Sequence, residues 1–162
     1  MSDVITEELP SFLQEGEVRQ GIELLFYAYR DFTAEPDTML ARYGFGRAHH
    51  RVIYFVGRHP HMSVSELLGI LQITKQSLSR VLGQLVRQGF IVQRTGKTDR
   101  RQRLLELTPK GIELERQISE NQRQRIARAF REAGPQAVEG FRKVMLGIMS
   151  GDADRARFRR SR

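Results

Sequence analysis

Residues 63–111 read SVSELLGILQITKQSLSRVLGQLVRQGFIVQRTGKTDRRQRLLELTPKG, and this stretch decides the fold of the 162-residue chain. Ser63 and Glu66 match the S-x-x-E capping box, which starts a short helix that turns three leucines inward, Leu67, Leu68 and Leu71. Only two residues separate these leucines from Thr74, a suitable N-cap for a second helix. Two short helices joined by so tight a turn predict a helix-turn-helix unit.

The second helix of this unit, residues 75–88, has the most regular apolar pattern in the chain. Its apolar residues follow the spacing i, i+3, i+4, i+7 and i+8 at Leu78, Val81, Leu82, Leu85 and Val86. The opposite face contains Gln76, Arg80, Gly83 and Arg87, flanked by Ser77, Ser79 and Gln84. That face has no acid and no large apolar side chain. Because phosphates repel carboxylates and base edges favour forked donors, such a face suits DNA.

A basic hairpin is expected directly after this helix, which Gly89 should end. Residues 90–94 and 103–107 have strand character, and residues 95–101 between them are turn-like. We interpret the hairpin as a wing. Thr108 and Pro109 then offer an N-cap and a first-turn proline for a long helix that should reach Ala133.

Positive charge is concentrated in this part of the chain. Residues 74–103 contain one acid, Asp99, and eight bases, Lys75, Arg80, Arg87, Arg94, Lys97, Arg100, Arg101 and Arg103, whereas the whole chain has a formal charge of +8. The first thirty residues have six acids and two bases. Clustering of this kind indicates a polyanionic partner more specifically than a high pI does.

The remaining segments predict further helices, from about Glu17 to Phe32 or beyond, from Arg47 to Arg58 before Pro60, and from about Gln136 to Met149. The predicted fold class is therefore mainly α with a small β-wing, a winged helix-turn-helix in a single chain, 1–162. The DNA-binding lobe should span residues 47–107. The helical segments 17–43 and 108–149 have more apolar surface than one copy needs, which favours a two-fold dimer. Residues 1–14 and 151–162 are expected to be flexible.

Composition excludes several other classes. With no cysteine there is no disulfide and no thiolate metal site. The sequence contains no run of about 18 apolar residues, so we expect no membrane span. The acidic start of the chain does not match a secretion signal, so a cytoplasmic location is expected. Because the chain lacks the G-x-S-x-G, H-E-x-x-H, phosphate-loop and Rossmann motifs, we expect neither an enzyme nor a cofactor.

The chain resembles the MarR (multiple antibiotic resistance regulator) family over roughly residues 19–149. The resemblance is sharpest in VSELLGILQITKQSLSRVLGQLVRQGFI and in GKTDRRQRLLELTPKG, where the D-x-R of the wing precedes L-T-x-x-G. It implies a homodimeric transcriptional regulator, more often a repressor, that binds a palindromic operator in double-stranded DNA. It also implies N- and C-terminal helices that interleave in the dimer.

The resemblance assigns DNA contacts by position in the motif. Gln76, Ser77 and Arg80 would contact bases, and Thr74, Lys75 and Ser79 would lie nearer phosphates. In the wing, whose contact residues are Lys97, Asp99, Arg100 and Arg101, Arg101 would enter the minor groove and Asp99 would hold it in place. The chemistry agrees, because a guanidinium can fork onto guanine O6 and N7.

Regulators of this family often bind a small aromatic or phenolic effector between the dimer helices and the DNA-binding lobe. By analogy, the candidate residues for such a pocket are Tyr27, Arg30, His50, Arg51 and Tyr54. Absence of cysteine excludes the thiol-based peroxide sensing of one branch of the family.

Two alternative functions remain open from the residues alone. One is a winged-helix module whose basic face binds an acidic protein. The other is a metal-responsive regulator using the four histidines, although His49 and His50 are adjacent and their side chains should point about 100° apart. We therefore expect no metal site.

Overall fold

The computed structural model describes residues 8–160 of the chain and is mainly helical with one small sheet. The predicted fold class, mainly α with a small β-wing, is confirmed. In chain order the elements are α1 (Glu15–Ala41), α2 (Arg47–Arg58), β1 (Met62–Ser63), α3 (Val64–Leu71), α4 (Lys75–Arg87), β2 (Ile91–Thr95), β3 (Arg103–Leu107), α5 (Pro109–Ala133), α6 (Pro135–Ile148) and α7 (Asp152–Arg160).

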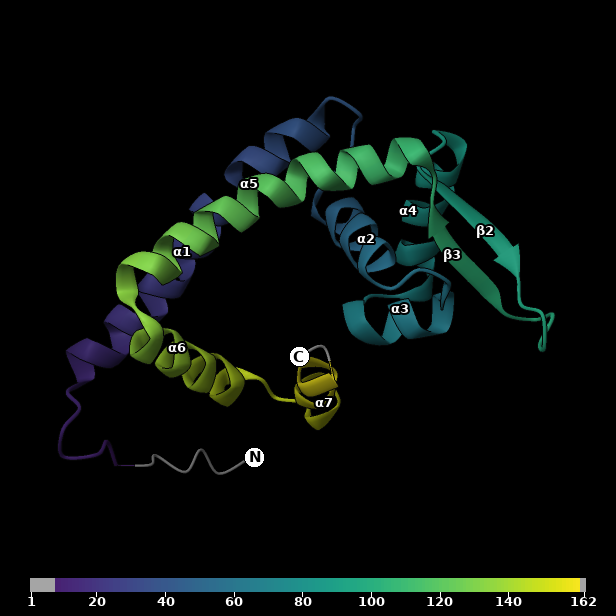
Figure 1. Cartoon of the computed structure of the whole chain (residues 1–162). Helices are drawn as coiled ribbons and strands as arrows, with labels where there is room; N and C mark the ends of the chain where they lie inside the picture. Colours follow the sequence, from purple (N-terminus) through teal and green to yellow (C-terminus); the bar gives the residue numbers. More distant parts are fainter. Residues whose placement is uncertain (1–7, 161–162) are drawn as a thin grey trace.

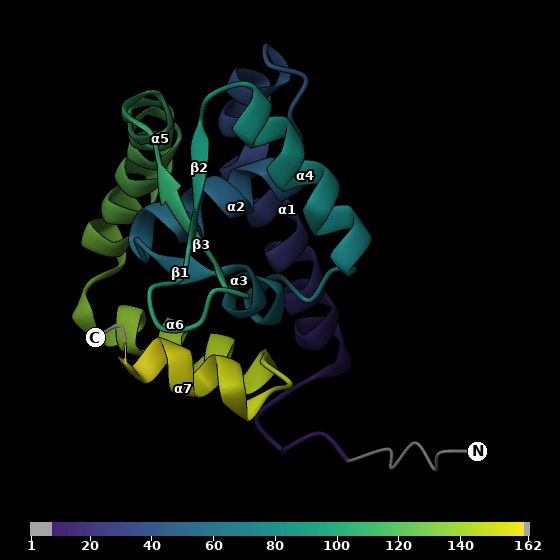
Figure 2. The same cartoon turned by 90° about the vertical axis from the view of Figure 1, so that its right-hand side faces the viewer.

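The molecule has two parts, a lobe formed by residues 47–107 and an arm formed by α1, α5 and α6 (Figure 1). In the arm, α1 and α5 lie side by side and contact each other. Helix α6 turns back from the end of α5 at Gly134, whose φ is +86°. Figure 2 looks onto the end of the lobe, where α4 lies beside the β2–β3 hairpin. This end lies away from the far tip of the arm.

Three hydroxyl N-caps predicted from the sequence are confirmed. Ser63, Thr74 and Thr108 each accept a hydrogen bond from the backbone N–H three residues later, at 3.1 Å in every case. Each cap satisfies one N–H that the first turn of a helix leaves without a partner. The starts of α3, α4 and α5 are therefore fixed by local sequence.

Two glycines allow the chain to connect α4, the sheet and α5. Gly89 follows the last turn of α4 with φ +79°, a left-handed conformation that favours glycine. At Gly111, a Cβ atom would lie 2.1 Å from the carbonyl oxygen of Phe90, so only glycine lets α5 approach the start of β2 this closely. The strand and helix are thereby held together at the base of the wing.

The sheet has the order β1–β3–β2 and is antiparallel throughout. Ile91 pairs with Leu107 at the base of the hairpin and Thr95 pairs with Arg103 near its tip, which agrees with the predicted wing to within one residue. The sequence did not predict β1, whose residue Met62 pairs with Leu105. A two-residue strand is too short to produce a detectable alternation.

The core lies where α2, α3, α4 and the sheet meet, and it extends to the end of α1 through Leu40 and to α5 through Leu114 and Ile118. Its fully buried side chains come from all of these elements and include Val52, Ile53, Val56, Leu67, Leu78, Val81, Leu85, Phe90, Ile91 and Leu105. Four of the five predicted inward residues of α4 are buried. Val86 is the exception at 38% exposure, because it lies at the edge of the apolar face in the last turn.

The arm, in contrast, leaves large apolar side chains uncovered. On α1, Ile22, Leu24 and Phe26 are each more than 60% exposed, and Tyr27 is half exposed. No residue of α6 is buried, and Val144 is 63% exposed. These exposed apolar faces belong to the segments that the sequence assigns to dimerisation.

The structure differs from the expectation of a flexible C-terminal end. Residues 152–160 form α7, whereas residues 161–162 lie outside the described residues. Arg155 of α7 donates hydrogen bonds to the carbonyl oxygens of Leu146 and Met149, which end α6. Of the predicted flexible N-terminal segment, residues 1–7 lie outside the described residues, and residues 8–14 contain a turn before α1.

Candidate nucleic-acid interface

The first turn of α4 presents the predicted reading residues on the outside of the lobe. Thr74, Lys75, Gln76, Ser79 and Arg80 are exposed, and Ser77 is half-buried. Burial of the opposite face of α4 in the core fixes which side chains point outward. The predicted set is therefore brought together on one surface.

Two of these residues also support the helix itself. The Thr74 hydroxyl accepts the Ser77 N–H at 3.1 Å and donates to the Ser77 hydroxyl oxygen at 2.9 Å. The Ser77 O–H remains able to donate to an acceptor outside the helix. Arg80 forms no ion pair with any described residue, so its guanidinium is available for a base edge or a phosphate.

The loop of the wing is a tight, well-bonded turn. Gly96 N–H donates to the carbonyl oxygen of Gln102 at 3.0 Å, and Gln102 N–H donates to that of Asp99 at 3.1 Å. The Asp99 carboxylate accepts the backbone N–H of Arg101 at 2.9 Å. Asp99 therefore holds the backbone of Arg101, and within the described residues it makes no ion pair with the Arg101 guanidinium.

A hollow of about 750 Å³ lies between the start of α3, α4 and the wing. Its lining combines reading-helix residues with wing residues, among them Lys75, Ser79, Asp99 and Arg101. Gln93 and Arg103 also line it, although the motif did not assign them a contact. Lys97 and Arg100 are exposed on the same loop but do not line the hollow. Three basic side chains, Lys75, Arg101 and Arg103, and one acid, Asp99, line this hollow, a charge balance that favours a polyanionic partner.

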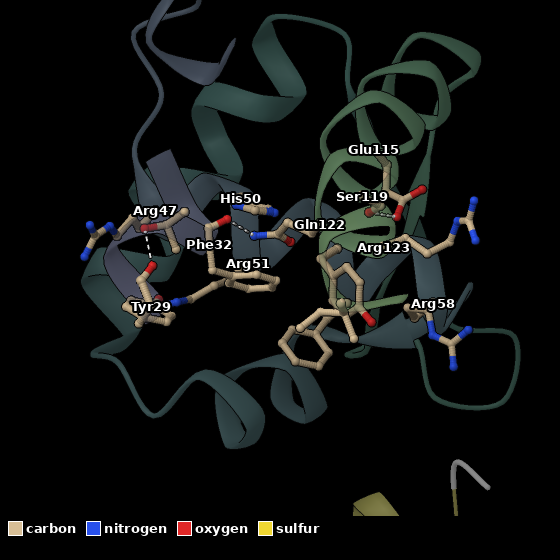
Figure 3. Close-up of a pocket in the computed structure, with 14 residues that line it drawn as sticks. Tyr29, Phe32, Arg47, His50, Arg51, Arg58, Glu115, Ser119, Gln122 and Arg123 are labelled. Carbon is tan, nitrogen blue, oxygen red and sulfur yellow. Dashed lines mark hydrogen bonds between the residues drawn. The ribbon is translucent and has the colours of Figure 1, made fainter. Parts of the chain in front are cut away.

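A second cavity, also of about 750 Å³, lies between α1, α2 and α5 (Figure 3). Three of the predicted effector residues, His50, Arg51 and Tyr54, line it. Aromatic rings and arginines dominate the remainder of the wall, which includes Tyr29, Phe32, Thr33, Arg47, Phe55, Arg58, Glu115, Ser119, Gln122, Arg123 and Ile126.

Tyr27 and Arg30, the other two predicted effector residues, do not line this cavity. Both lie on another face of α1, where the Arg30 guanidinium stacks over the Tyr27 ring at 5.0 Å. The cavity face of α1 instead presents Tyr29 and Phe32. Apolar residues nearly surround this helix, so the sequence did not define which face meets α2 and α5.

Two arginines of the cavity wall form polar contacts with α1. The Arg51 guanidinium donates to the Tyr29 hydroxyl at 3.0 Å, and the Arg47 side chain pairs with the Asp37 carboxylate at 3.3 Å. Burial lowers the pKa of His50, with the Asp37 carboxylate acting in the opposite direction. His50 is therefore neutral at neutral pH, and the cationic groups of the wall are arginines.

The histidines do not gather into a metal centre. His49 and His50 are buried in α2, whereas His59 and His61 are exposed beyond its end. Within residues 8–160, no group of three or more histidine, aspartate and glutamate side chains could hold a metal ion. The same residues contain no helix with both the length and the apolar character needed to cross a membrane.

Comparisons with known proteins identify the family. Residues 43–102 match the family model of the MarR family. The chain is 51% identical over 138 residues to the HTH-type transcriptional regulator PetP of Rhodobacter capsulatus, which covers 85% of this chain and 83% of that protein. The chain belongs to the MarR family. Family membership and the basic winged helix together make it a DNA-binding regulator of transcription.

Solved structures of the family share the fold. The crystal structure of FabT from Streptococcus pneumoniae in complex with DNA matches with a TM-score of 0.70 and 18% identity, covering 81% of this chain and 94% of that chain. A crystal structure of MarR matches with a TM-score of 0.61 and 20% identity, covering 95% and 98% of the two chains. These similarities extend over both the lobe and the arm.

Proposed function

We propose that this MarR-family chain acts as a homodimeric repressor that binds a palindromic operator and releases it when a small aromatic or phenolic effector enters the α1–α2–α5 cavity. The observation that carries the proposal is the acid-free, exposed face of α4 beside a basic wing. The proposed role is regulatory rather than catalytic, and a cytoplasmic location suits it.

The proposed contacts follow the two parts of the interface. Gln76, Ser77 and Arg80 contact base edges, while Thr74, Lys75 and Ser79 contact phosphates. Arg101 enters the minor groove, and Asp99 shapes the loop that presents it. FabT, a protein of the same fold, was crystallised in complex with DNA, which supports DNA as the partner.

Dimerisation is proposed to use residues 17–43 and 108–149. Exposed apolar side chains of α1 and α6 provide the surface, and a second copy is the partner that self-complementary packing requires. A dimer would set two copies of α4 about 34–36 Å apart, one turn of DNA.

The proposed effector is a small aromatic anion. Tyr29, Phe32 and Tyr54 offer ring faces, and Arg47 and Arg51 offer donors for a carboxylate or phenolate. An effector must bind two conformers of the dimer with different affinity, because otherwise it shifts no equilibrium.

Selection of genomic fragments by the purified chain tests the function. The proposal expects enrichment of fragments that share an inverted repeat, and competition by the selected repeat but not by scrambled DNA of equal length. Equal competition by both would contradict it and favour a protein partner for the basic face. Elemental analysis of the same preparation would detect a metal-dependent alternative.

A further inference from the structure

The cavity and the reading helix are connected through α2. The inner side of α2 packs on α4 inside the lobe, and its other side supplies His50, Arg51 and Tyr54 to the cavity wall. One polar contact crosses between the two helices: the Nε2 atom of His49 lies 2.5 Å from the Oε1 atom of Gln84 in α4. His49 is only 6% exposed, so water does not readily replace this contact.

Hydrogen bonding determines which tautomer the neutral His49 ring adopts. The backbone N–H of Gly46 donates to Nδ1 of His49 at 3.0 Å, so Nδ1 acts as an acceptor and has no proton. Nε2 must then hold the proton of the neutral ring, and it donates to Gln84. The ring also stacks on Phe45, with centroids 4.6 Å apart. Contacts with Gly46, Gln84 and Phe45 thus fix the orientation of the His49 ring.

The first turn of α2 contains both this contact and a cavity residue. Arg47, the first residue of α2, lines the cavity and pairs with Asp37 of α1. The second carboxylate oxygen of Asp37, Oδ1, is buried and has no hydrogen-bond partner among the described residues. The Arg47–Asp37 pair therefore satisfies only part of the carboxylate, and an anion in the cavity would compete with Asp37 for Arg47.

Gln84 is well placed to transmit a displacement. It lies four residues after Arg80, so the two side chains occupy neighbouring positions on one face of α4. A shift at Gln84 therefore changes how Arg80 is presented to a DNA groove.

We propose that the His49–Gln84 hydrogen bond couples the α1–α2–α5 cavity to the reading helix, with His49 and Gln84 as positioning residues. An anion that draws Arg47 away from Asp37 displaces the first turn of α2, and His49 transfers the displacement to α4. This inference rests on the proposed effector function, and it assigns the route by which occupancy of that cavity changes operator binding.

The test uses the full chain, the selected operator and 4-hydroxybenzoate as the probe. Gln84→Met removes the acceptor at similar volume, Gln84→Glu keeps an acceptor, and Gln88→Met makes the same change one turn later as a matched control. Operator affinity is measured by fluorescence anisotropy with and without the probe, and probe binding by calorimetry. Circular dichroism verifies folding, and His49→Phe, which keeps a ring on Phe45, replaces any Gln84 variant that does not fold.

The unaltered chain and the Gln88→Met control should lose operator affinity on probe binding by a factor within the range of roughly 5 to 150 that is typical of allosteric coupling. Gln84→Met should bind the probe but lose less than about twofold in operator affinity. Gln84→Glu should bind DNA more weakly overall, since a carboxylate approaches phosphates, yet retain the probe effect. An undiminished probe effect in Gln84→Met would overturn the proposal.

A second arm needs neither probe nor DNA, so it separates failure of the coupling route from failure of the proposed function. Asp37→Asn weakens the Arg47 pair, and hydrogen exchange of the amides of residues 75–88 reports on α4. The proposal expects faster exchange on Asp37→Asn in the unaltered background and little change in the Gln84→Met background. Equal responses in both backgrounds, or no response in either, would overturn it. Absence of probe binding would count against the proposed effector class only.

Discussion

The lobe and the arm differ in how completely one copy of the chain buries their apolar side chains. In the lobe, α2, α3, α4 and the sheet bury a shared core together with Leu40 of α1 and Leu114 and Ile118 of α5, and the exposed surface is basic and polar. In the arm, α1 and α6 leave large apolar side chains in contact with solvent. A single copy thus buries the apolar side chains of the DNA-binding lobe, but it does not cover those of the arm, which should join two copies of the lobe. This difference indicates that DNA affinity depends on surfaces far from the DNA.

The largest expected effect comes from the arm. Phe26→Glu combined with Val144→Glu places charges on its exposed apolar surface and should convert the dimer to a monomer. Because linked half-sites gain about 10² to 10⁴ in avidity, operator affinity should fall by at least about 100-fold. Sedimentation velocity and anisotropy measure the two quantities.

Gln20→Glu is the control for added charge, since it places one negative charge at an exposed polar position of α1, against two in the double variant. It should remain dimeric and bind normally. A monomeric double variant with unchanged operator affinity would remove the proposed link between arm and lobe.

The next largest effect belongs to the reading helix. Arg80→Ala removes an exposed, unpaired guanidinium and should cost about 1–3 kcal/mol of operator binding while relaxing base preference at one position of each half-site. Competition with single-base operator variants measures both changes. Arg131→Ala, an exposed arginine at the end of α5, should leave binding unchanged. A uniform loss over all sequences would instead make Arg80 a phosphate contact.

Substitutions in the wing should change operator affinity less than Arg80→Ala does, and the direction of the change in Asp99→Ala tests the role of Asp99. Arg101→Ala should weaken operator binding and reduce the salt slope by about one unit, as expected for one lost ionic contact. Asp99→Ala raises the net charge but frees the Arg101 backbone N–H, so it should also weaken operator binding, by several-fold, while binding to scrambled DNA rises. Tighter operator binding by Asp99→Ala in an anisotropy titration would refute the positioning role.

The smallest expected effect is a change in thermal stability on substitution of Glu120, in the polar middle of α5. Hydrogen bonds from Arg123 and Gln124 lower the pKa of Glu120 to about 2, below its ordinary value of 4.5. A lowered pKa in the folded state stabilises the fold at neutral pH, and this stabilisation is lost as pH falls through about 2. Glu120→Gln should therefore lower Tm slightly at pH 7, and the difference should shrink in acid. An effect that grew in acid would contradict this sign.

Much of the lobe could be predicted because its signals are local. The hydroxyls of Ser63, Thr74 and Thr108 act on residues three positions away, and the apolar period of α4 defines its inner face. In contrast, β1 has no pattern of its own and forms only because β3 lies beside it. Its existence depends on tertiary contacts that the sequence does not display.

The remaining differences have similar causes. A charged C-terminal segment resembles a disordered tail in composition, but α7 gains ion pairs such as Arg157–Asp154 and a contact from Arg155 to the end of α6. The cavity required knowledge of which face of α1 meets α2, and apolar residues on nearly every side of α1 concealed it. The His49–Gln84 contact joins residues 35 positions apart, and no local motif indicates it.

Footprinting of the selected operator most directly tests the account in which two copies of the basic lobe, joined by the arm, read one DNA site. Such a dimer should protect two half-sites related by a dyad, with centres about 10–10.5 base pairs or a multiple of this apart, at a stoichiometry of one dimer per site. A single protected half-site bound by a monomer, or uniform protection without regard to sequence, would contradict it.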